Sequence, residues 1–364
     1  MTETLYSPLH ERHVALGAKF SEFGGWRMPL QYSGVVAEHR AVRSAVGIFD
    51  VSHLGKLRIV GEGAAAFVNR CITNDLNRIA PGQAQYTLLC NESGGVTDDL
   101  ISYLISPEEV LLIPNASNTT KVGQLLAVSA PASVRVFNEH RDHAVLAVQG
   151  SSSDEVLAVL GLPVDLEYLS FTTATWNGVD LIVCRTGYTG EKGYELVVPA
   201  AAAGTLWDAV LAAGAEYDIV PCGLGARDTL RTEMGYPLHG HDLSPRISPV
   251  MANLGWAVGW DKPDFWGATA LREQRQAKSG RLLRGLKATG RGIPRPDMVV
   301  QLDGAEVGTI TSGTFSPTLS IGVALALLDR SVKVGDTVDV VVRDRLEPFT
   351  VAKPPFVEPG VREA

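Results

Sequence analysis

Two adjacent aspartates within an apolar strand pattern are the first residues whose type and position indicate chemistry. They lie in GGVTDDLISYLI, residues 94–105. Because alternate residues of a strand face the same side, Asp98 and Asp99 point to opposite faces, and each face also carries apolar residues. We therefore expect this strand to be covered on both sides. An acid is disfavoured there, and a buried carboxylate needs partners. The alternative is that both acids close the turn at Gly94 and Gly95.

A second acid in an apolar strand pattern is Glu195, at the end of RTGYTGEKGYEL (residues 185–196). Glycines at 187, 190 and 193 predict a tight hairpin before it. A carboxylate held in this way suits a fork of N–H donors, such as a guanidinium or an amino-pyrimidine ring. The alternative is a glutamate at the rim or edge of a sheet, in contact with water.

An arginine in the first turn of a predicted helix is the third feature. It is Arg227 in GLGARDTLRTEMG, residues 223–235. A cation at this position opposes the helix dipole, so another interaction should justify it, such as a bidentate carboxylate partner. The alternative is a structural salt bridge to Asp228 or Glu233.

Several other patterns carry little weight. Gly61-x-Gly63-x-x-Ala66 has the outline of a dinucleotide-binding loop, but the acid expected about 20 residues later is missing. Pairs of the H-x-x-H type, such as His10 and His13, have no third ligand at suitable spacing, so no metal site is expected. No nucleophile-elbow or phosphate-loop motif occurs in the sequence.

The composition limits the class of protein. The chain has 364 residues, 45% of them hydrophobic, which is enough for two or three domains with large cores. A net charge of −8 argues against nucleic-acid binding and against polybasic attachment to a membrane. We see neither a secretory signal nor an apolar run of about 18 residues. Four widely spaced cysteines fit a reduced, cytoplasmic protein.

The elements that must position these residues form two regions. Residues 1–280 mix strands and helices without steady β-α-β alternation, which predicts an α+β fold. WGATALREQRQAKSG (266–280) predicts a helix that ends at Gly280. From about residue 281, short strands with turns between them predict a separate β-barrel or sandwich. Asp303-Gly304 between two apolar runs is a strong hairpin signal there.

The chain resembles the aminomethyltransferases of the glycine cleavage system, the T-proteins, along nearly its whole length. The matching stretches are FGGWRMPLQY (23–32), GIFDVSHLG (47–55), TND (73–75), GGVTDDL (94–100), RTGYTGEKGYEL (185–196), GLGARDTLRTE (223–233), ISP (247–249) and SGTFSPTL (312–319). Two positions depart mildly from the family pattern. Ser151 stands where proline is usual, and Leu54 follows His53 where methionine is common.

This resemblance implies a fold and an activity. The family fold is a three-domain cloverleaf around a central folate channel. The expected domains are 1–54 with 139–244, 55–138 with 245–280, and a C-terminal β-barrel at 281–364. The family takes an aminomethyl group from the lipoyl arm of the H-protein. It transfers the one-carbon unit to tetrahydrofolate, and the products are 5,10-methylenetetrahydrofolate, ammonia and the dihydrolipoyl carrier.

The same resemblance assigns residue roles by motif. Asp99 is expected beside nitrogen 10 of the folate, where its negative charge faces the developing cation, and no metal is required. Glu195 is expected to anchor the pterin ring. The channel is expected to be lined by Tyr86, Tyr103 and Tyr188. Arg227 is expected to bind the folate or pair with its acidic neighbours, and Arg362 to close over the co-substrate.

Related functions remain as alternatives. Related folate-binding modules occur at the C-terminal end of the flavin-dependent sarcosine and dimethylglycine dehydrogenases. Those enzymes are long fusions, and this sequence has no flavin domain. A non-enzymatic folate-binding factor for iron–sulfur cluster assembly has the same fold. Such factors carry a cysteine-containing K-G-C-Y-x-G-Q-E stretch, which does not occur in this sequence.

Overall fold

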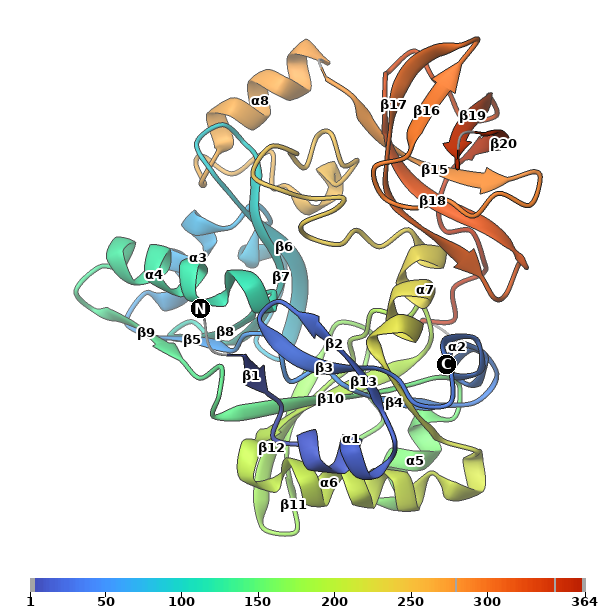
Figure 1. Ribbon diagram of the computed structural model, residues 1–364. Helices are drawn as coiled ribbons and strands as arrows, with labels where there is room; N and C mark the ends of the chain where they lie inside the picture. The colour runs from blue at the N-terminus through green and yellow to red at the C-terminus, as the bar shows by residue number, and fades with distance from the viewer. Residues whose placement is uncertain (1–3, 279, 344, 362–364) are drawn as a thin grey trace.

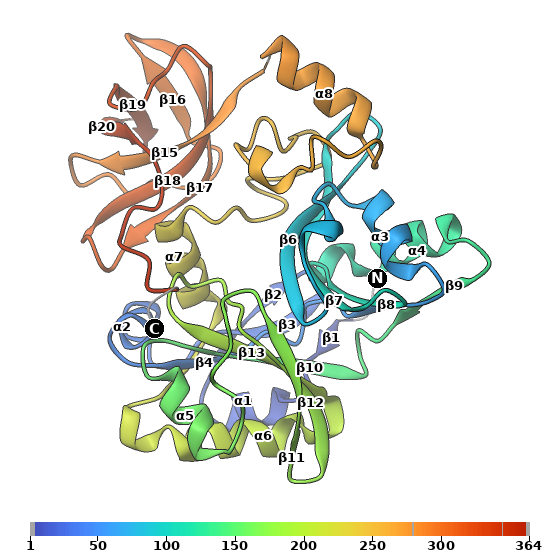
Figure 2. The ribbon, with the colours of Figure 1, turned by 180° about the vertical axis from the view of Figure 1, so that it is seen from behind.

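Three lobes surround a central region in the structure, a computed structural model that describes residues 4–278, 280–343 and 345–361. Figure 1 shows a five-stranded sheet with its helices on the left, a six-stranded sheet below and a barrel at the upper right. Helix α7 (Leu224–Met234) lies at the centre, between the barrel and the two sheets, and the hairpin of β6 (Gln83–Cys90) and β7 (Val96–Ser106) forms the inner edge of the five-stranded sheet, as Figure 2 also shows from behind. The α+β class predicted from the sequence is confirmed.

The five-stranded sheet has the order β6-β7-β8-β5-β9 and is antiparallel throughout. One face packs on two helices, because Leu100 and Leu104 of β7 point to the cluster that contains Phe67 and Leu126 from those helices. The remaining elements of this lobe are β5 (Leu57–Gly61), α3 (Ala64–Cys71), η1 (Leu76–Arg78), β8 (Glu109–Ile113), η2 (Ala116–Asn118), α4 (Thr119–Ser129) and β9 (Val134–Asn138).

The six-stranded sheet has the order β11-β12-β13-β10-β4-β14, and only its β14–β4 pair is parallel. Alternate residues of β10, such as Leu146 and Val148, pack with Trp207 of α6 on one face. Its elements are α2 (Val35–Ser44), β4 (Gly47–Asp50), β10 (His143–Gln149), α5 (Ser153–Val159), β11 (Phe171–Trp176), β12 (Val179–Cys184), β13 (Gly193–Pro199), α6 (Ala200–Ala213), η3 (Ala215–Tyr217) and β14 (Val220–Cys222).

The two sheets pack on each other through their second faces. Tyr103 of β7 and Leu111 of β8 share one buried cluster with Val145 and Val197 of the six-stranded sheet. Strand β7 is therefore covered on both sides, by helices on the face of Asp98 and by the other sheet on the face of Asp99. This confirms the expectation drawn from its apolar pattern.

The C-terminal strands form a closed barrel in the order β15-β18-β17-β16-β19-β20. Asp303 and Gly304 both have positive φ, 52° and 80°, which matches the hairpin turn that the sequence predicts between β16 and β17. The barrel strands are β15 (Leu282–Ala288), β16 (Val299–Leu302), β17 (Ala305–Ser316), β18 (Ile321–Leu328), β19 (Thr337–Val342) and β20 (Arg345–Ala352).

The N-terminal segment and the segment before the barrel complete the fold. A small sheet of order β1-β3-β2 precedes α2. Helix α8 ends at Ala277 rather than at Gly280, because Lys278 already adopts a left-handed conformation with φ of 48°. These elements are β1 (Leu5–Tyr6), α1 (His10–Ala15), β2 (Lys19–Phe23), β3 (Trp26–Gln31), η4 (Gly255–Ala257) and α8 (Ala268–Ala277).

Two points concern the chain as a whole. Within the described ranges, no helix combines the length and apolar character needed to span a bilayer.

The chain leaves the six-stranded sheet after β4, builds the five-stranded sheet with β5 to β9, and returns with β10. The residue limits of the first two domains stay a proposal, which this crossing of the chain supports.

Candidate active site

Asp99 lies on β7 with hydrogen-bond donors from two directions. Leu88 pairs with Asp99 across the β6–β7 ladder, so Tyr86 lies diagonally opposite on the same face. The Tyr86 hydroxyl donates to Oδ2 of Asp99 at 2.9 Å, and the Asn115 side-chain amide donates to Oδ1 at 3.0 Å. Burial raises the pKa of Asp99, while the bond from Tyr86 and the nearby His239 lower it in part.

Asp98 points away from Asp99 and is bound by two asparagines. It accepts hydrogen bonds from the Asn115 backbone N–H at 3.1 Å, from the Asn115 side chain at 2.9 Å and from the Asn118 side chain at 2.6 Å. Burial and then the charge of Asp99 raise the pKa of Asp98 to about 8. The side chain of Asn91, and neither aspartate, closes the preceding turn. The turn-closing alternative is therefore wrong.

Glu195 connects to the same face of β7 through a threonine. The Tyr103 hydroxyl lies 3.2 Å from Oγ1 of Thr186, which donates to Oε2 of Glu195 at 2.6 Å. Glu195 is half-buried on β13, a strand hydrogen-bonded on both sides, so it is not on a sheet edge. Burial raises the pKa of Glu195, and the Thr186 bond and the charge of Arg227 lower it in part.

The glycine-rich loop before Glu195 packs closely on its surroundings. A Cβ at Gly190, whose φ is +85°, would lie 2.1 Å from the sulfur of Met234 on α7. A Cβ at Gly187 would lie 2.1 Å from the side-chain oxygen of Gln149, which accepts a hydrogen bond from Thr189 at 2.7 Å. The glycines therefore bring the β12–β13 hairpin against the helix that carries Arg227.

Arg227 faces Tyr188, which lies in the middle of this loop. The Arg227 guanidinium carbon lies 4.3 Å from the centre of the Tyr188 ring, within cation–π range. The Tyr188 hydroxyl donates to the carbonyl of Pro237. Burial lowers the pKa of Arg227, and the nearby Tyr188 and Glu195 raise it in part. Both side chains are half-buried, so part of each remains open to a ligand.

The acids expected as alternative partners of Arg227 are bound by other arginines. Asp228 pairs with Arg231 at 2.7 Å, and Glu233 pairs with Arg43 at 2.9 Å. No salt bridge to Arg227 occurs among the residues that the structure describes. The structural salt-bridge reading is therefore wrong for those residues, and the guanidinium is held by the face of Tyr188.

Hollows next to Tyr188 and Arg227 lead toward the barrel. A small cavity of about 30 Å³ is lined by both residues. A wider groove of about 400 Å³ extends to Arg295 and Thr314 of the barrel. The cavity and the groove share five lining residues: Phe23, Leu224, Asp228, Arg231 and Leu238. The small cavity at Tyr188 and Arg227 therefore shares a wall with a surface groove between α7 and the barrel.

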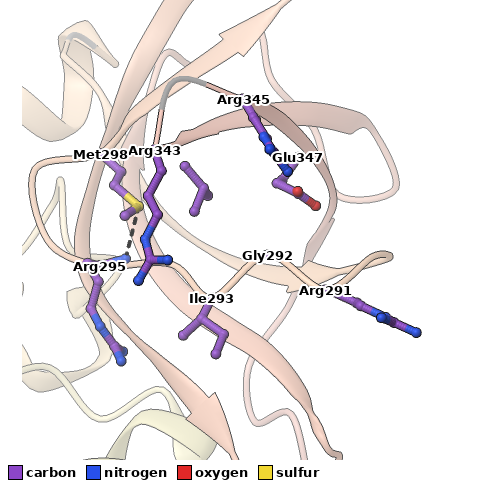
Figure 3. A pocket seen from close by; sticks show the side chains of 9 residues that line it. Arg291, Gly292, Ile293, Arg295, Met298, Arg343, Arg345 and Glu347 are labelled. Carbon is purple, nitrogen blue, oxygen red and sulfur yellow. Dashed lines mark hydrogen bonds between the residues drawn. The ribbon is translucent and has the colours of Figure 1, made fainter.

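A separate cavity of about 480 Å³ lies on the barrel itself. Figure 3 shows arginine side chains around it, with Glu347 beside Arg345 and with Arg343 reaching toward Ile293. It shares Arg295 with the groove, but it contains none of the site residues predicted from the sequence. Its lining residues are Arg291, Gly292, Ile293, Arg295, Met298, Val342, Arg343, Arg345 and Glu347.

The predictions for Arg362 and for the absence of a metal site are not tested by the structure. Arg362 lies outside the described residues. Within residues 4–278, 280–343 and 345–361, no three histidine, cysteine, aspartate or glutamate side chains are grouped so as to hold a metal ion.

Comparison with known proteins identifies the family. The family model described as the GCVT N-terminal domain matches residues 9–262, and the glycine cleavage T-protein C-terminal barrel domain matches residues 281–358. The chain belongs to the T-protein family, the aminomethyltransferases of the glycine cleavage system. Membership makes it an enzyme and confirms the resemblance drawn from the motifs; the non-enzymatic alternative is not supported.

The similarity to individual T-proteins covers whole chains. The chain is 60% identical over 365 residues to the aminomethyltransferase of Parafrankia sp. (strain EAN1pec), with 100% of both chains covered. It is 61% identical to that of Frankia alni, over 98% of this chain and 99% of the other. The crystal structure of aminomethyltransferase T from Bartonella henselae superposes with a TM-score of 0.92 at 34% identity, covering 98% and 99%.

The site contains side chains that the sequence analysis did not predict. Asn115 bridges both aspartates, Thr186 links Tyr103 to Glu195, and Trp256 stacks on Tyr86. A signal existed for Asn115, because VLLIPN places an amide directly after an apolar strand and a proline. Nothing in the local pattern around Thr186 or Trp256 indicates these contacts.

Proposed function

We propose that this T-protein takes the one-carbon unit of the aminomethyl group on the lipoyl arm of the H-protein and transfers it to tetrahydrofolate. The products would be 5,10-methylenetetrahydrofolate, ammonia and the dihydrolipoyl carrier. The observation that carries this proposal is the buried carboxylate of Asp99, bound by Tyr86 and Asn115 on the strand face that also leads to Glu195.

The groups around Asp99 and Glu195 support the proposal of folate binding. Glu195 presents a carboxylate that can accept two N–H bonds from the amino-pyrimidine edge of the pterin. Tyr188 supplies an aromatic wall beside Arg227, and Tyr86 places a second ring beside Asp99. Tyr103 is buried between the two sheets, and its hydroxyl lies 3.2 Å from Oγ1 of Thr186. Arg227 offers a cation whose bound neighbour is an aromatic face, so a carboxylate of the folate can still pair with it.

The chemistry needs alignment and charge rather than a protein nucleophile. The nitrogen lone pair of the aminomethyl group breaks the C–S bond, which leaves an iminium and the carrier thiolate. Nitrogen 5 of the folate attacks the iminium carbon, ammonia leaves, and nitrogen 10 closes the ring. The protons of these two nitrogens end on the thiol and on ammonia, so the step balances without an oxidant.

Asp99 would act on the charge that develops in this sequence. An ionised carboxylate in a water-poor site stabilises an adjacent cation more strongly than it does in water. Tyr86 and Asn115 hold both carboxylate oxygens, so the group is oriented before the substrates arrive. Burial raises the pKa of Asp99, and these two hydrogen bonds lower it in part, so they favour the ionised form.

One assay tests the proposal. Aminomethylated H-protein and tetrahydrofolate are mixed with the enzyme, and ammonia and 5,10-methylenetetrahydrofolate are measured together. We expect equal amounts of both products and acceleration that depends on folate. Release of ammonia at the same rate without folate would show that the one-carbon unit goes elsewhere.

Two further parts of the proposal concern the location of the protein and the role that the family resemblance gives to Arg362. A cytoplasmic location fits four buried free cysteines. Arg362 keeps its proposed role over the co-substrate, which a truncation after Val361 would test through folate affinity.

A further inference from the structure

Trp256 is a large apolar side chain that the fold leaves in solvent. It is 65% exposed, although it lies on the short turn η4, which is firmly held. Oγ1 of Thr73 donates to the carbonyl of Ala257 at 2.8 Å, and the indole N–H of Trp260 donates to the carbonyl of Gly255 at 2.8 Å. The turn is therefore held by neighbouring groups, and burial of Trp256 is not what stabilises it.

Among the residues that the structure describes, the one aromatic ring that stacks on Trp256 belongs to the candidate site. Its indole stacks on the ring of Tyr86, with centroids 5.5 Å apart and planes inclined by 29°. The Tyr86 hydroxyl in turn donates to Asp99 at 2.9 Å. A chain of contacts therefore runs from the protein surface, through two aromatic rings, to the carboxylate.

Stacking on Trp256 restricts the rotation of the Tyr86 ring, and the hydrogen bond to Asp99 requires one orientation of that ring. The position of a phenol oxygen is set by the rotation of its ring about two side-chain torsions. Tyr86 is half-buried, so the protein core alone does not enclose its ring. An aromatic pair of this kind favours one ring orientation by roughly two- to tenfold. Removal of the indole would leave the ring freer and the bond to Asp99 less populated.

We infer that Trp256 is a positioning residue for the transfer reaction and acts on Asp99 through Tyr86. The inference rests on the proposed function, because it assumes that an ionised Asp99 is needed for turnover. It adds a surface residue from the segment between α7 and α8 to the groups that act on Asp99.

The sign of the effect follows from the groups that surround Asp99. Tyr86 and Asn115 donate to it, and His239 also favours its ionised form, whereas burial opposes ionisation. The charge of Asp99 in turn raises the pKa of Asp98. Tyr188 is near enough for Asp99 to raise its pKa. Loss of the Tyr86 bond should raise the pKa of Asp99, so the acid limb of the kcat profile moves to higher pH.

The test is a double-mutant cycle on that acid limb, measured with the full chain, aminomethylated H-protein and tetrahydrofolate. We expect Trp256→Ala and Tyr86→Phe each to move the limb upward, the second by about one pH unit, the value of one hydrogen bond. Trp256→Phe keeps a ring and should stay near the wild type. The double variant should move no further than Tyr86→Phe alone. Val128→Ala, at an 88% exposed position on α4, is the matched control.

Each other outcome overturns the inference. An unchanged pH profile with a raised KM for H-protein would make Trp256 a contact of the carrier. A downward shift would mean that it only keeps water from Asp99, and additive shifts would mean that it acts independently of Tyr86. If the wild type itself shows no folate-dependent turnover, the proposed function fails instead. Thermal unfolding of each variant tests whether the fold is retained.

Discussion

Asp99 and Glu195 are both carboxylates in apolar strands, yet their neighbours suit them to different tasks. Asp99 accepts from a tyrosine and an amide that belong to the site itself, so its charge is oriented and enclosed. Glu195 accepts from Thr186 through one oxygen, Oε2, and remains half-buried. We therefore propose that Asp99 acts on the reacting atoms and that Glu195 binds the co-substrate.

Replacement of Asp99 by asparagine should separate chemistry from binding. Asp99→Asn keeps the shape and removes the charge, so we expect kcat to fall by about 10²- to 10³-fold. Folate affinity measured by calorimetry should change little. Asp261→Asn is the matched control, because its side chain is 96% exposed. Loss of folate binding in Asp99→Asn would assign the residue an anchoring role.

Replacement of Glu195 should have the opposite profile. Glu195→Ala removes a charged acceptor, so we expect folate affinity to fall by roughly 10- to 100-fold. Turnover at saturating folate should be affected less. The same change at Glu216, which is exposed on η3, serves as the control. Equal affinities of Glu195→Ala and the wild type in calorimetry would exclude the pterin role.

At the scale of elements, the β12–β13 hairpin shows how the close packing of a loop positions the side chains that it contributes to a site. Its glycines allow contact with Gln149 and Met234, and this contact places Tyr188 over Arg227 of α7. The β6–β7 hairpin acts differently, because its ladder register alone puts Tyr86 diagonally across from Asp99. One element therefore depends on tertiary packing and the other on strand pairing.

Two glycines with similar backbone angles test this difference. Gly178 has φ of +79°, and no atom lies within 4 Å of a Cβ added there. Gly190 has φ of +85°, and a Cβ added there would clash with the side chain of Met234. We expect Gly178→Ala to lower the free energy of unfolding by about 1 kcal/mol. Gly190→Ala should cost about 1–3 kcal/mol more, because it also overpacks the loop against α7. Denaturant titration measures both, and equal losses would show that the loop yields easily.

At the scale of the whole molecule, the barrel is joined to the six-stranded lobe by a buried acid. Glu233 on α7 accepts from Ser316 at 2.5 Å and from the Thr318 hydroxyl at 2.9 Å, and it lies 3.3 Å from His39 of α2. Although burial raises the pKa of Glu233, the bonds from His39 and Ser316 and the charge of Arg43 lower it to about 2. This carboxylate therefore links α2, α7 and the barrel.

The depressed pKa of Glu233 predicts how its contribution to the free energy of unfolding changes with pH. A depressed pKa contributes stability above the ordinary value of 4.5, and this contribution is lost as the pH falls toward about 2. We expect Glu233→Gln to lower the free energy of unfolding at pH 7 by about 3 kcal/mol, because Arg43 loses its buried partner. The difference from the wild type should shrink between pH 4.5 and about 2.

Glu306→Gln, on an exposed part of the barrel, is the control for that measurement. A difference between Glu233→Gln and the wild type that stays constant as the pH falls through this range would contradict the role given to the charge.

The sequence by itself determined the local features and the family. The periodicity and turn chemistry of neighbouring residues predict three elements that the structure contains. They are strand β7 with apolar residues on both faces, the Asp303-Gly304 turn and the helix that carries Arg227. The motifs also contained the family assignment. Asp99, Glu195 and Arg227 were recognisable because each places a charge where its own element disfavours one.

Only the tertiary structure decided which groups meet these charges. Asn115 reaches both aspartates, Tyr188 rather than an acid holds Arg227, and Trp256 reaches Tyr86 from a distant turn. These partners come from segments whose separation along the chain bears no relation to any periodicity. They meet because two sheets and a helix bury their apolar faces together, and that burial acts over the whole molecule rather than within one element.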